Sequence, residues 1–136
     1  MITVTRKEHF NAAHRLFRED LTDEENLRVF GKCSNPNWHG HNYTLYVTVK
    51  GEIKEDTGFV ADLRSLSALI QEKVIIKIDH KNINLEVDFM KGILPTTENL
   101  AVAIWKELEP EVKKLGVEIH SIRVEETEKN SAEYFG

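Results

Sequence analysis

The chain has 136 residues, a formal net charge of −5 at pH 7, 40% hydrophobic residues and 30% charged residues. This length suits a single domain, residues 1–136, with its own hydrophobic core. The negative charge argues against a general nucleic-acid surface, and the most apolar stretch, KVIIKI, is too short to cross a membrane. With one cysteine and no apolar signal segment, a cytoplasmic location is expected.

The first half of the chain predicts two strands separated by a polar loop. Residues 2–14 begin with period-two alternation, which predicts a strand whose buried face carries Ile2, Val4, Phe10, Ala12 and His14. The acidic stretch 17–32 predicts an exposed loop, with a helical turn as an alternative. Residues 39–50 alternate again and predict a second strand.

The second half predicts two helices followed by two strands. Asp62 and Thr96 are suitable N-caps, and apolar residues follow each at helical spacing. Pro110 is expected to kink or end the second helix, with a restart over 111–115, and Gly116 is a suitable stop. Residues 117–127 and 131–135 read as strands. The order ββααββ predicts an α+β fold, an antiparallel sheet with two helices on one face.

Three histidines suggest a metal site. His39 and His41 are two apart on a predicted strand, so both side chains leave the same face. His14 ends the first strand on its buried face, and antiparallel pairing would bring it near His39. Three histidines with an open fourth position are typical of catalytic zinc. The alternative is a set of half-buried, hydrogen-bonded histidines without a metal.

Three further positions carry reactive groups whose roles the residues alone leave open. Cys33 is a zinc ligand, a buried inert thiol or a reactive group, and the pattern by itself favours the buried thiol. Asp79 can orient and charge the adjacent His80, although such pairs also arise by chance. Glu126 shares the strand face of Ile122 and Val124. It is either a solvated strand end or an anchor for a ligand with two adjacent N–H donors.

The order of several segments resembles a known family over nearly the whole chain. The chain is similar to the 6-pyruvoyl-tetrahydropterin synthases, and to their bacterial relatives the 6-carboxy-tetrahydropterin synthases. The matching segments are FNAAHRL, FGKCSNPNWHGHNY, GEIKEDTGFVADL, IDHKNIN, TTENLAVAIW and VEETEKN. The cysteine with HGHNY and a downstream DHKN is the most specific combination.

The resemblance implies a role for each candidate residue and an assembly. It implies the tunnelling fold, in which three subunits close their sheets into a barrel, two trimers stack into a homohexamer, and sites lie between subunits. Zn²⁺ would be bound by His14, His39 and His41. Cys33, Asp79 and His80 would be catalytic, and Glu126 would anchor the pterin, in a pocket lined by Thr96, Thr97 and Glu98.

The implied reaction converts 7,8-dihydroneopterin triphosphate to 6-pyruvoyl-tetrahydropterin with loss of triphosphate. The five residues between Cys33 and His39 favour this reaction over the carboxy-forming one of queuosine biosynthesis, whose enzymes commonly have a shorter gap. A non-catalytic zinc- or pterin-binding barrel is a third interpretation. One position departs from the family pattern: Trp38 stands where relatives often carry glycine, which puts substrate details in question.

Overall fold

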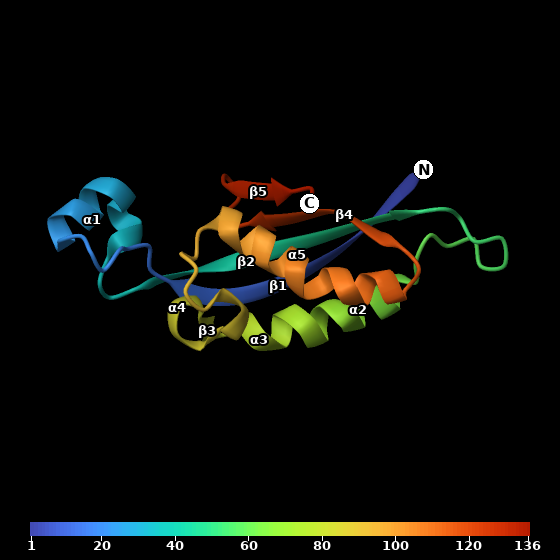
Figure 1. Cartoon of the computed structure of the whole chain (residues 1–136), viewed down its shortest axis with the longest axis horizontal. Helices are drawn as coiled ribbons and strands as arrows, with labels where there is room; N and C mark the ends of the chain where they lie inside the picture. Colours follow the sequence, from blue (N-terminus) through green and yellow to red (C-terminus); the bar gives the residue numbers. More distant parts are fainter.

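The computed structural model describes all 136 residues and contains one five-stranded sheet. The strands are β1 (Ile2–His14), β2 (His39–Gly51), β3 (Lys81–Asn82), β4 (Glu118–Glu125) and β5 (Ser131–Tyr134). They lie in the order β3-β1-β2-β4-β5 (Figure 1). The predicted α+β architecture is confirmed. The sheet is mixed rather than wholly antiparallel, because the two-residue β3 pairs in parallel with β1.

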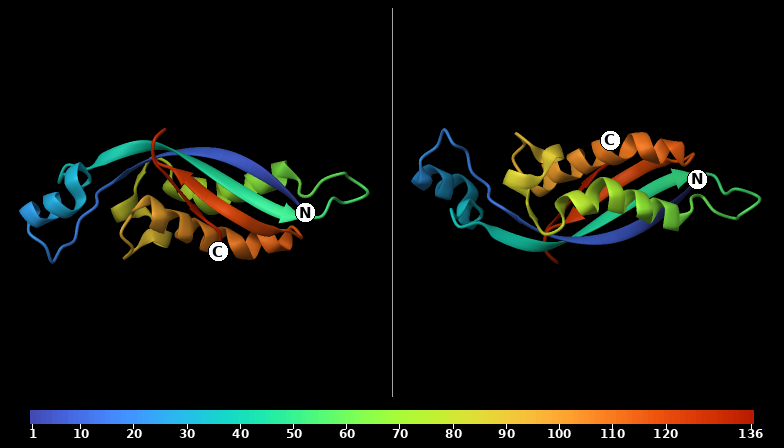
Figure 2. Two further views of the ribbon diagram at one scale, coloured as in Figure 1. Left: turned by 90° about the horizontal axis from the view of Figure 1, so that it is seen from above. Right: turned by 90° about the horizontal axis from the view of Figure 1, so that it is seen from below.

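Two long helical segments cover one face of the sheet. The first is α2 (Leu63–Ile70), which continues through a π-helical turn (Gln71–Ile75) into α3 (Ile76–Ile78). The second is α5 (Thr97–Lys114). Figure 2 shows both on the same side of the strands. Both predicted N-caps are confirmed: Asp62 accepts a hydrogen bond from the Arg64 N–H, and Thr96 accepts one from the Asn99 N–H.

Helix α5 runs through Pro110, so the expectation that this proline would end the helix is wrong. Pro110 lies on the exposed side of the helix, while Ile104, Leu108 and Val112 on the other side are fully buried. Burial of each such side chain contributes about 1.5–3 kcal/mol, which together exceeds the cost of about 3 kcal/mol for one internal proline. The helix ends where predicted, before Gly116, whose φ of +78° suits glycine.

The polar segment between β1 and β2 forms helix α1 (Asp23–Phe30) and a 3-10 turn (Gly31–Ser34), more structure than the predicted loop. Thr22 caps α1, and three acidic residues occupy its first turn. Short helical pieces also follow β3, namely α4 (Ile83–Glu86) and a 3-10 turn (Asp88–Met90). Figure 1 shows α1 projecting beyond the end of the sheet. None of the helices is long and apolar enough to cross a membrane.

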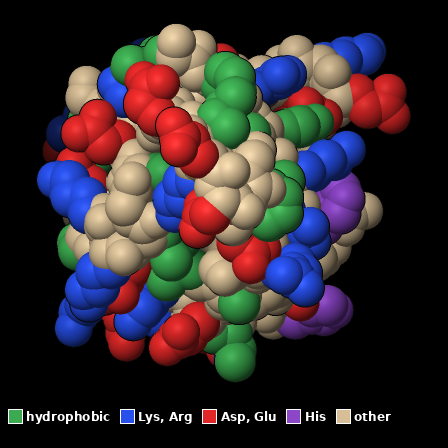
Figure 3. Space-filling model, turned by 90° about the vertical axis from the view of Figure 1, so that its right-hand side faces the viewer, with side chains coloured by type: hydrophobic (Ala, Val, Ile, Leu, Met, Phe, Trp, Pro, Cys, Tyr) green, Lys and Arg blue, Asp and Glu red, His purple; other side chains and the backbone are tan.

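The hydrophobic core lies between the sheet and the helices. Tyr43, Leu45, Val47 and Val49, alternate residues of β2, are buried against α2 and α5. His39 and His41 continue the same alternation, so the core face of β2 begins with two imidazoles. At the opposite end of the molecule acidic and basic side chains are intermixed (Figure 3).

Candidate metal centre

Strand pairing brings the three predicted histidines together. In the register of β1 with β2, His14 lies opposite His39, and Ala12 lies opposite His41. The ring centroids are 4.6 Å apart for His14 and His39, 5.2 Å for His14 and His41, and 5.0 Å for His39 and His41. The proximity predicted from antiparallel pairing is therefore present.

Gly40 allows the two strands to approach at this point. A Cβ atom on Gly40 would lie 3.1 Å from the carbonyl oxygen of Ala12 on the neighbouring strand. That oxygen belongs to the backbone, so it cannot rotate away as a side chain would. A residue with a side chain at position 40 would therefore push apart the strands that carry the histidines.

The imidazole nitrogens are arranged as metal ligands. His14 Nδ1 donates a hydrogen bond to the Pro95 carbonyl at 2.9 Å, so the lone pair of this ring resides on Nε2. Four buried nitrogens have no hydrogen-bond partner: His14 Nε2, His39 Nδ1, His39 Nε2 and His41 Nε2. Buried polar atoms without partners are costly. A bound cation would satisfy one nitrogen of each ring, so these residues fit a metal.

The protonation state of the rings also suits a metal. Burial lowers the pKa of both His39 and His41, and the neighbouring imidazoles add to this effect, against the opposing influence of the Glu126 carboxylate. The two rings are therefore held in the neutral form, which is the form that binds metal ions.

A carboxylate completes the group. Glu126 follows the last residue of β4, and its Oε1 lies 2.7 Å from His41 Nε2 and 3.5 Å from His14 Nε2. Its Oε2 accepts a hydrogen bond from the Thr97 hydroxyl at 2.7 Å. One potential ligand atom from each of His14, His39, His41 and Glu126 lies within 4.8 Å of all the others. The sequence did not place Glu126 in the metal group, because its position depends on the turn after β4.

The surroundings keep Glu126 charged. The contact with the His14 ring, the hydrogen bond from Thr97 and the electrostatic attraction of the neighbouring imidazoles lower its pKa to about 2, against the opposing effect of burial. The site therefore combines three imidazoles with one ionised carboxylate.

Cys33 lies on the 3-10 turn Gly31–Ser34 before β2, and the group of four potential ligands does not include it. The Leu16 N–H donates to the Cys33 carbonyl at 2.8 Å, and Arg15 Nε donates to the Ser34 carbonyl at 2.8 Å. Burial, and then the negative charge of Glu126, raise the pKa of the Cys33 thiol. A cation bound by the histidines would lower the pKa of this thiol.

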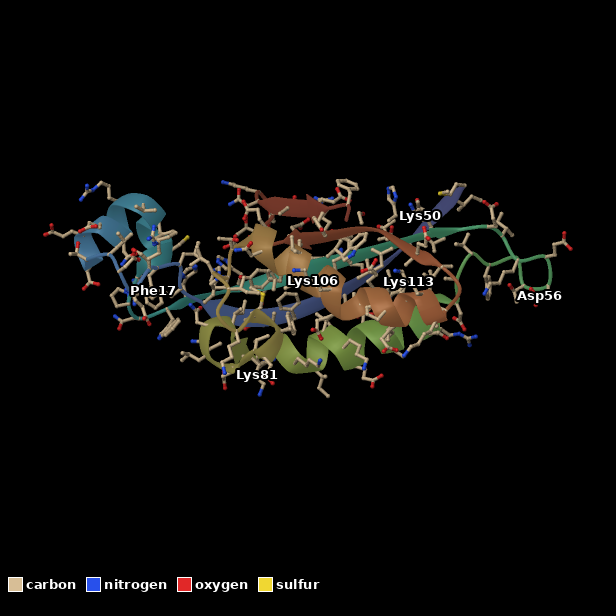
Figure 4. The ribbon with its side chains drawn as sticks, in the orientation of Figure 1. Phe17, Lys50, Asp56, Lys81, Lys106 and Lys113 are labelled. Carbon is tan, nitrogen blue, oxygen red and sulfur yellow. The ribbon has the colours of Figure 1, made fainter.

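Asp79 and His80 form a pair at the β3 edge of the sheet. Asp79 Oδ2 lies 2.9 Å from His80 Nδ1, and Asp79 Oδ1 accepts a hydrogen bond from the Asn11 N–H at 2.8 Å. The His80 N–H donates to the Asn11 carbonyl, and His80 has a φ of +60°. Its side chain is 81% exposed, and no hydrogen bond or ion pair joins it to Cys33 or to the three histidines. Lys81, the next residue, marks this edge in Figure 4.

The remaining predicted residues have different surroundings. Thr97 is buried against Glu126, whereas the Thr96 hydroxyl is used as the cap of α5, and Glu98 is exposed in the first turn of that helix. Trp38 has a φ of +68°, a backbone conformation that favours glycine. Glycine would adopt this conformation at a lower cost than tryptophan.

The fold and this group of side chains define an α+β protein with a candidate site for a metal ion, bound by three histidines and a carboxylate. The family model for 6-pyruvoyl tetrahydropterin synthase matches residues 3–136. The chain belongs to this family.

Individual relatives agree with the family assignment. The chain is 45% identical to the human 6-pyruvoyl tetrahydrobiopterin synthase over 133 residues, which cover 98% of this chain and 90% of that protein. The structure of Caenorhabditis elegans 6-pyruvoyl tetrahydropterin synthase superposes with a TM-score of 0.91 at 38% identity, covering 99% of this chain and 95% of the other. The 6-carboxy-5,6,7,8-tetrahydropterin synthase of Bacillus subtilis is 33% identical over 104 residues, 74% of this chain and 61% of that protein.

Proposed function

We propose that this protein is a zinc-dependent lyase that converts 7,8-dihydroneopterin triphosphate to 6-pyruvoyl-tetrahydropterin and triphosphate. The observation that carries the proposal is the group of three imidazoles beside Glu126, in a chain of this family. Zinc is the proposed metal because three histidines with a further position form its usual catalytic site. The higher identity and coverage of the pyruvoyl-named relatives favour this product over the carboxy product.

Each group of the site has a chemical task in this proposal. His14, His39 and His41 hold the metal, which when bound supplies a positive charge that acidifies the C–H bonds next to the substrate hydroxyls. Cys33 as thiolate accepts a proton from the substrate side chain, and the Asp79–His80 pair is the second proton carrier. Glu126 accepts two hydrogen bonds from the guanidine-like edge of the pterin, beside Thr97. Thr96 and Glu98 belong to the same end of α5 and line the pocket mouth.

The proposed reaction balances without an external reductant. Triphosphate leaves the side chain, and proton shifts convert its two hydroxyl-bearing carbons to carbonyls while the pterin ring is reduced. The competing carboxy reaction consumes one water and releases acetaldehyde as well as triphosphate. The two reactions therefore differ in a product that is simple to measure.

The proposed assembly is a homohexamer of two stacked trimers with sites between chains. The position of Asp79 and His80 supports it, because within one chain this pair makes no contact with Cys33. A neighbouring chain in the barrel would supply the pair to the site. Location in the cytoplasm is proposed from the single free cysteine.

One assay tests the reaction. The zinc-loaded protein is incubated with 7,8-dihydroneopterin triphosphate, and triphosphate and acetaldehyde are measured. We expect triphosphate alone. Acetaldehyde in equal amount would establish the carboxy reaction, and release of neither product would indicate a binding protein. Cys33→Ala should bind zinc normally and lose turnover, and normal turnover by this variant would contradict the role given to Cys33.

A further inference from the structure

We propose that Glu126 is a displaceable fourth metal ligand. Its carboxylate occupies the fourth ligand position beside the three histidines when no substrate is bound. When substrate binds, the carboxylate leaves the metal and binds the pterin. This inference rests on the proposed function, since it concerns the same site and the same two ligands. It adds a second, competing role to a residue assigned only to pterin binding.

The contact between Glu126 and His14 has the spacing of two ligands of one ion, whereas the contact with His41 is shorter. Two ligands about 2.1 Å from a tetrahedral zinc ion lie roughly 3.4 Å apart. Glu126 Oε1 lies 3.5 Å from His14 Nε2, and the four potential ligand atoms lie within 4.8 Å of one another. Glu126 therefore reaches the site without any movement of the backbone.

The directions of the contacts support ligation over a simple hydrogen bond. The 2.7 Å separation of Glu126 Oε1 and His41 Nε2 is short enough for a hydrogen bond. Nevertheless, His41 Nε2 has no hydrogen-bond partner of acceptable geometry, so its N–H direction does not point at this oxygen. The two atoms are therefore close without the alignment of a hydrogen bond, which leaves His41 Nε2 available to a cation.

Thr97 fixes the orientation of the carboxylate. Its hydroxyl donates to Oε2 at 2.7 Å from the first residue of α5, a buried position. With Oε2 held by the helix, Oε1 is directed at His14 and His41. Thr97 is thus a positioning residue for this arrangement.

The two roles of Glu126 compete for the same oxygen, Oε1. A pterin edge with two adjacent N–H donors requires both carboxylate oxygens, whereas the arrangement in the structure commits Oε1 to the histidine group. Binding of the pterin would draw Oε1 away and free the fourth position beside the histidines. The substrate would thereby open its own site, because it binds only the state in which Glu126 has left the metal.

The test uses metal binding and spectroscopy rather than turnover. Zinc affinity is measured by competition with a chromophoric chelator for the wild-type protein, Glu126→Gln and the control Glu125→Gln. Glu125 ends β4 and is paired with Arg123 at 3.3 Å. Glu126→Gln should bind zinc at least about tenfold more weakly, and Glu125→Gln should match the wild type. Unchanged zinc affinity in Glu126→Gln would overturn the proposal.

A second measurement needs no variant that could fail to fold. The visible spectrum of the Co²⁺-loaded wild-type protein is recorded before and after addition of 7,8-dihydropterin, which lacks the triphosphate side chain. We expect a change of the d–d bands as the carboxylate leaves, and an unchanged spectrum would refute the displacement. If the spectrum changes but dihydroneopterin triphosphate is not consumed, the ligand exchange stands and the proposed reaction fails.

Discussion

The last residue of β1, His14, lies directly opposite the first residue of β2, His39. The two strands therefore end in one cluster of imidazoles, with His41 one pleat further into the sheet. Because this geometry is a property of strand register, any shift of one strand against the other would separate the nitrogens. Gly40 lies where the strands leave little room, since a Cβ built on it would lie 3.1 Å from the Ala12 carbonyl oxygen.

Gly40→Ala should therefore weaken metal binding. The added Cβ would lie 3.1 Å from the Ala12 oxygen, so the strands must move apart. We expect a loss of about 1–3 kcal/mol in the free energy of unfolding and a measurable fall in zinc affinity. Gly51→Ala, at the other end of β2, is the control, because its Cβ would meet the side chains of Val117 and Val60 instead. If both variants bind zinc equally well, the role given to Gly40 is wrong.

The sequence predicts that the three histidines lie together, but it does not predict that Glu126 lies beside them. Alternation on β1 and β2 identifies the shared face, and antiparallel pairing of consecutive strands is common enough to place His14 beside His39. Glu126 lies one residue beyond β4, and the side chain that orients it, Thr97, comes from another element. No local pattern encodes such a contact, so its approach to the histidines becomes visible only in the folded chain.

At the scale of elements, the turn that carries Cys33 is attached to the residues that follow His14. Arg15 donates from Nε to the Ser34 carbonyl, and its guanidinium lies 4.0 Å from the centre of the Phe17 ring. Its side chain is only 14% exposed. Arg15 follows His14 in the chain and binds the residue after Cys33, so it joins the turn that carries the thiol to the strand that carries a metal ligand.

Arg15→Met should loosen this turn. Loss of a hydrogen bond from a charged group costs about 1.5–3 kcal/mol, so the free energy of unfolding should fall by this amount. Alkylation of Cys33 by iodoacetamide at fixed pH should become faster, because the turn opens more often. Arg18→Met is the matched control, since Arg18 is an exposed partner of Asp20 and should matter little. Equal alkylation rates in the two variants would argue against a role for Arg15 in holding the turn.

Elements with strong periodicity are predictable here, and short ones are not. The two helix caps and the stop at Gly116 follow from single residues with clear local preferences. Strand β3 has two residues, and it forms because the Asn11 backbone binds both Asp79 and His80. The prediction that Pro110 would end the helix was wrong, since local preference was outweighed by the buried side of α5.

Pro110→Ala tests that last explanation. Alanine restores the missing N–H toward the Lys106 carbonyl at an exposed position of the helix, so the free energy of unfolding should rise by about 1–3 kcal/mol. Denaturant titration measures the change. Pro36→Ala, in the turn before β2, has no helical hydrogen bond to restore and should give no gain. A loss of stability in Pro110→Ala would show that the proline ring makes favourable contacts that the fold depends on.

At the scale of the whole molecule, both edges of the sheet are incomplete. Strand β3 covers only Ala12 and Ala13 of β1, so most of that strand is an open edge, and β5 forms the other edge. Open edges of this length favour pairing with another chain. The same β1 edge carries the exposed His80, at a place where a neighbouring sheet would lie in the proposed barrel.

Mixed assemblies of two inactive variants test whether sites are shared between chains. Cys33→Ala lacks the proposed proton acceptor, and His80→Ala lacks the proposed second carrier. If each site takes Cys33 from one chain and His80 from the next, random mixing of equal amounts leaves about a quarter of the sites intact. The two variants are unfolded together, refolded, and assayed for triphosphate release, with each variant refolded alone as the control. We expect roughly a quarter of wild-type activity in the mixture and almost none in the controls. Activity no higher than that of either variant alone would mean that Cys33 and His80 act within one chain, and full activity of His80→Ala alone would mean that His80 takes no part in the reaction.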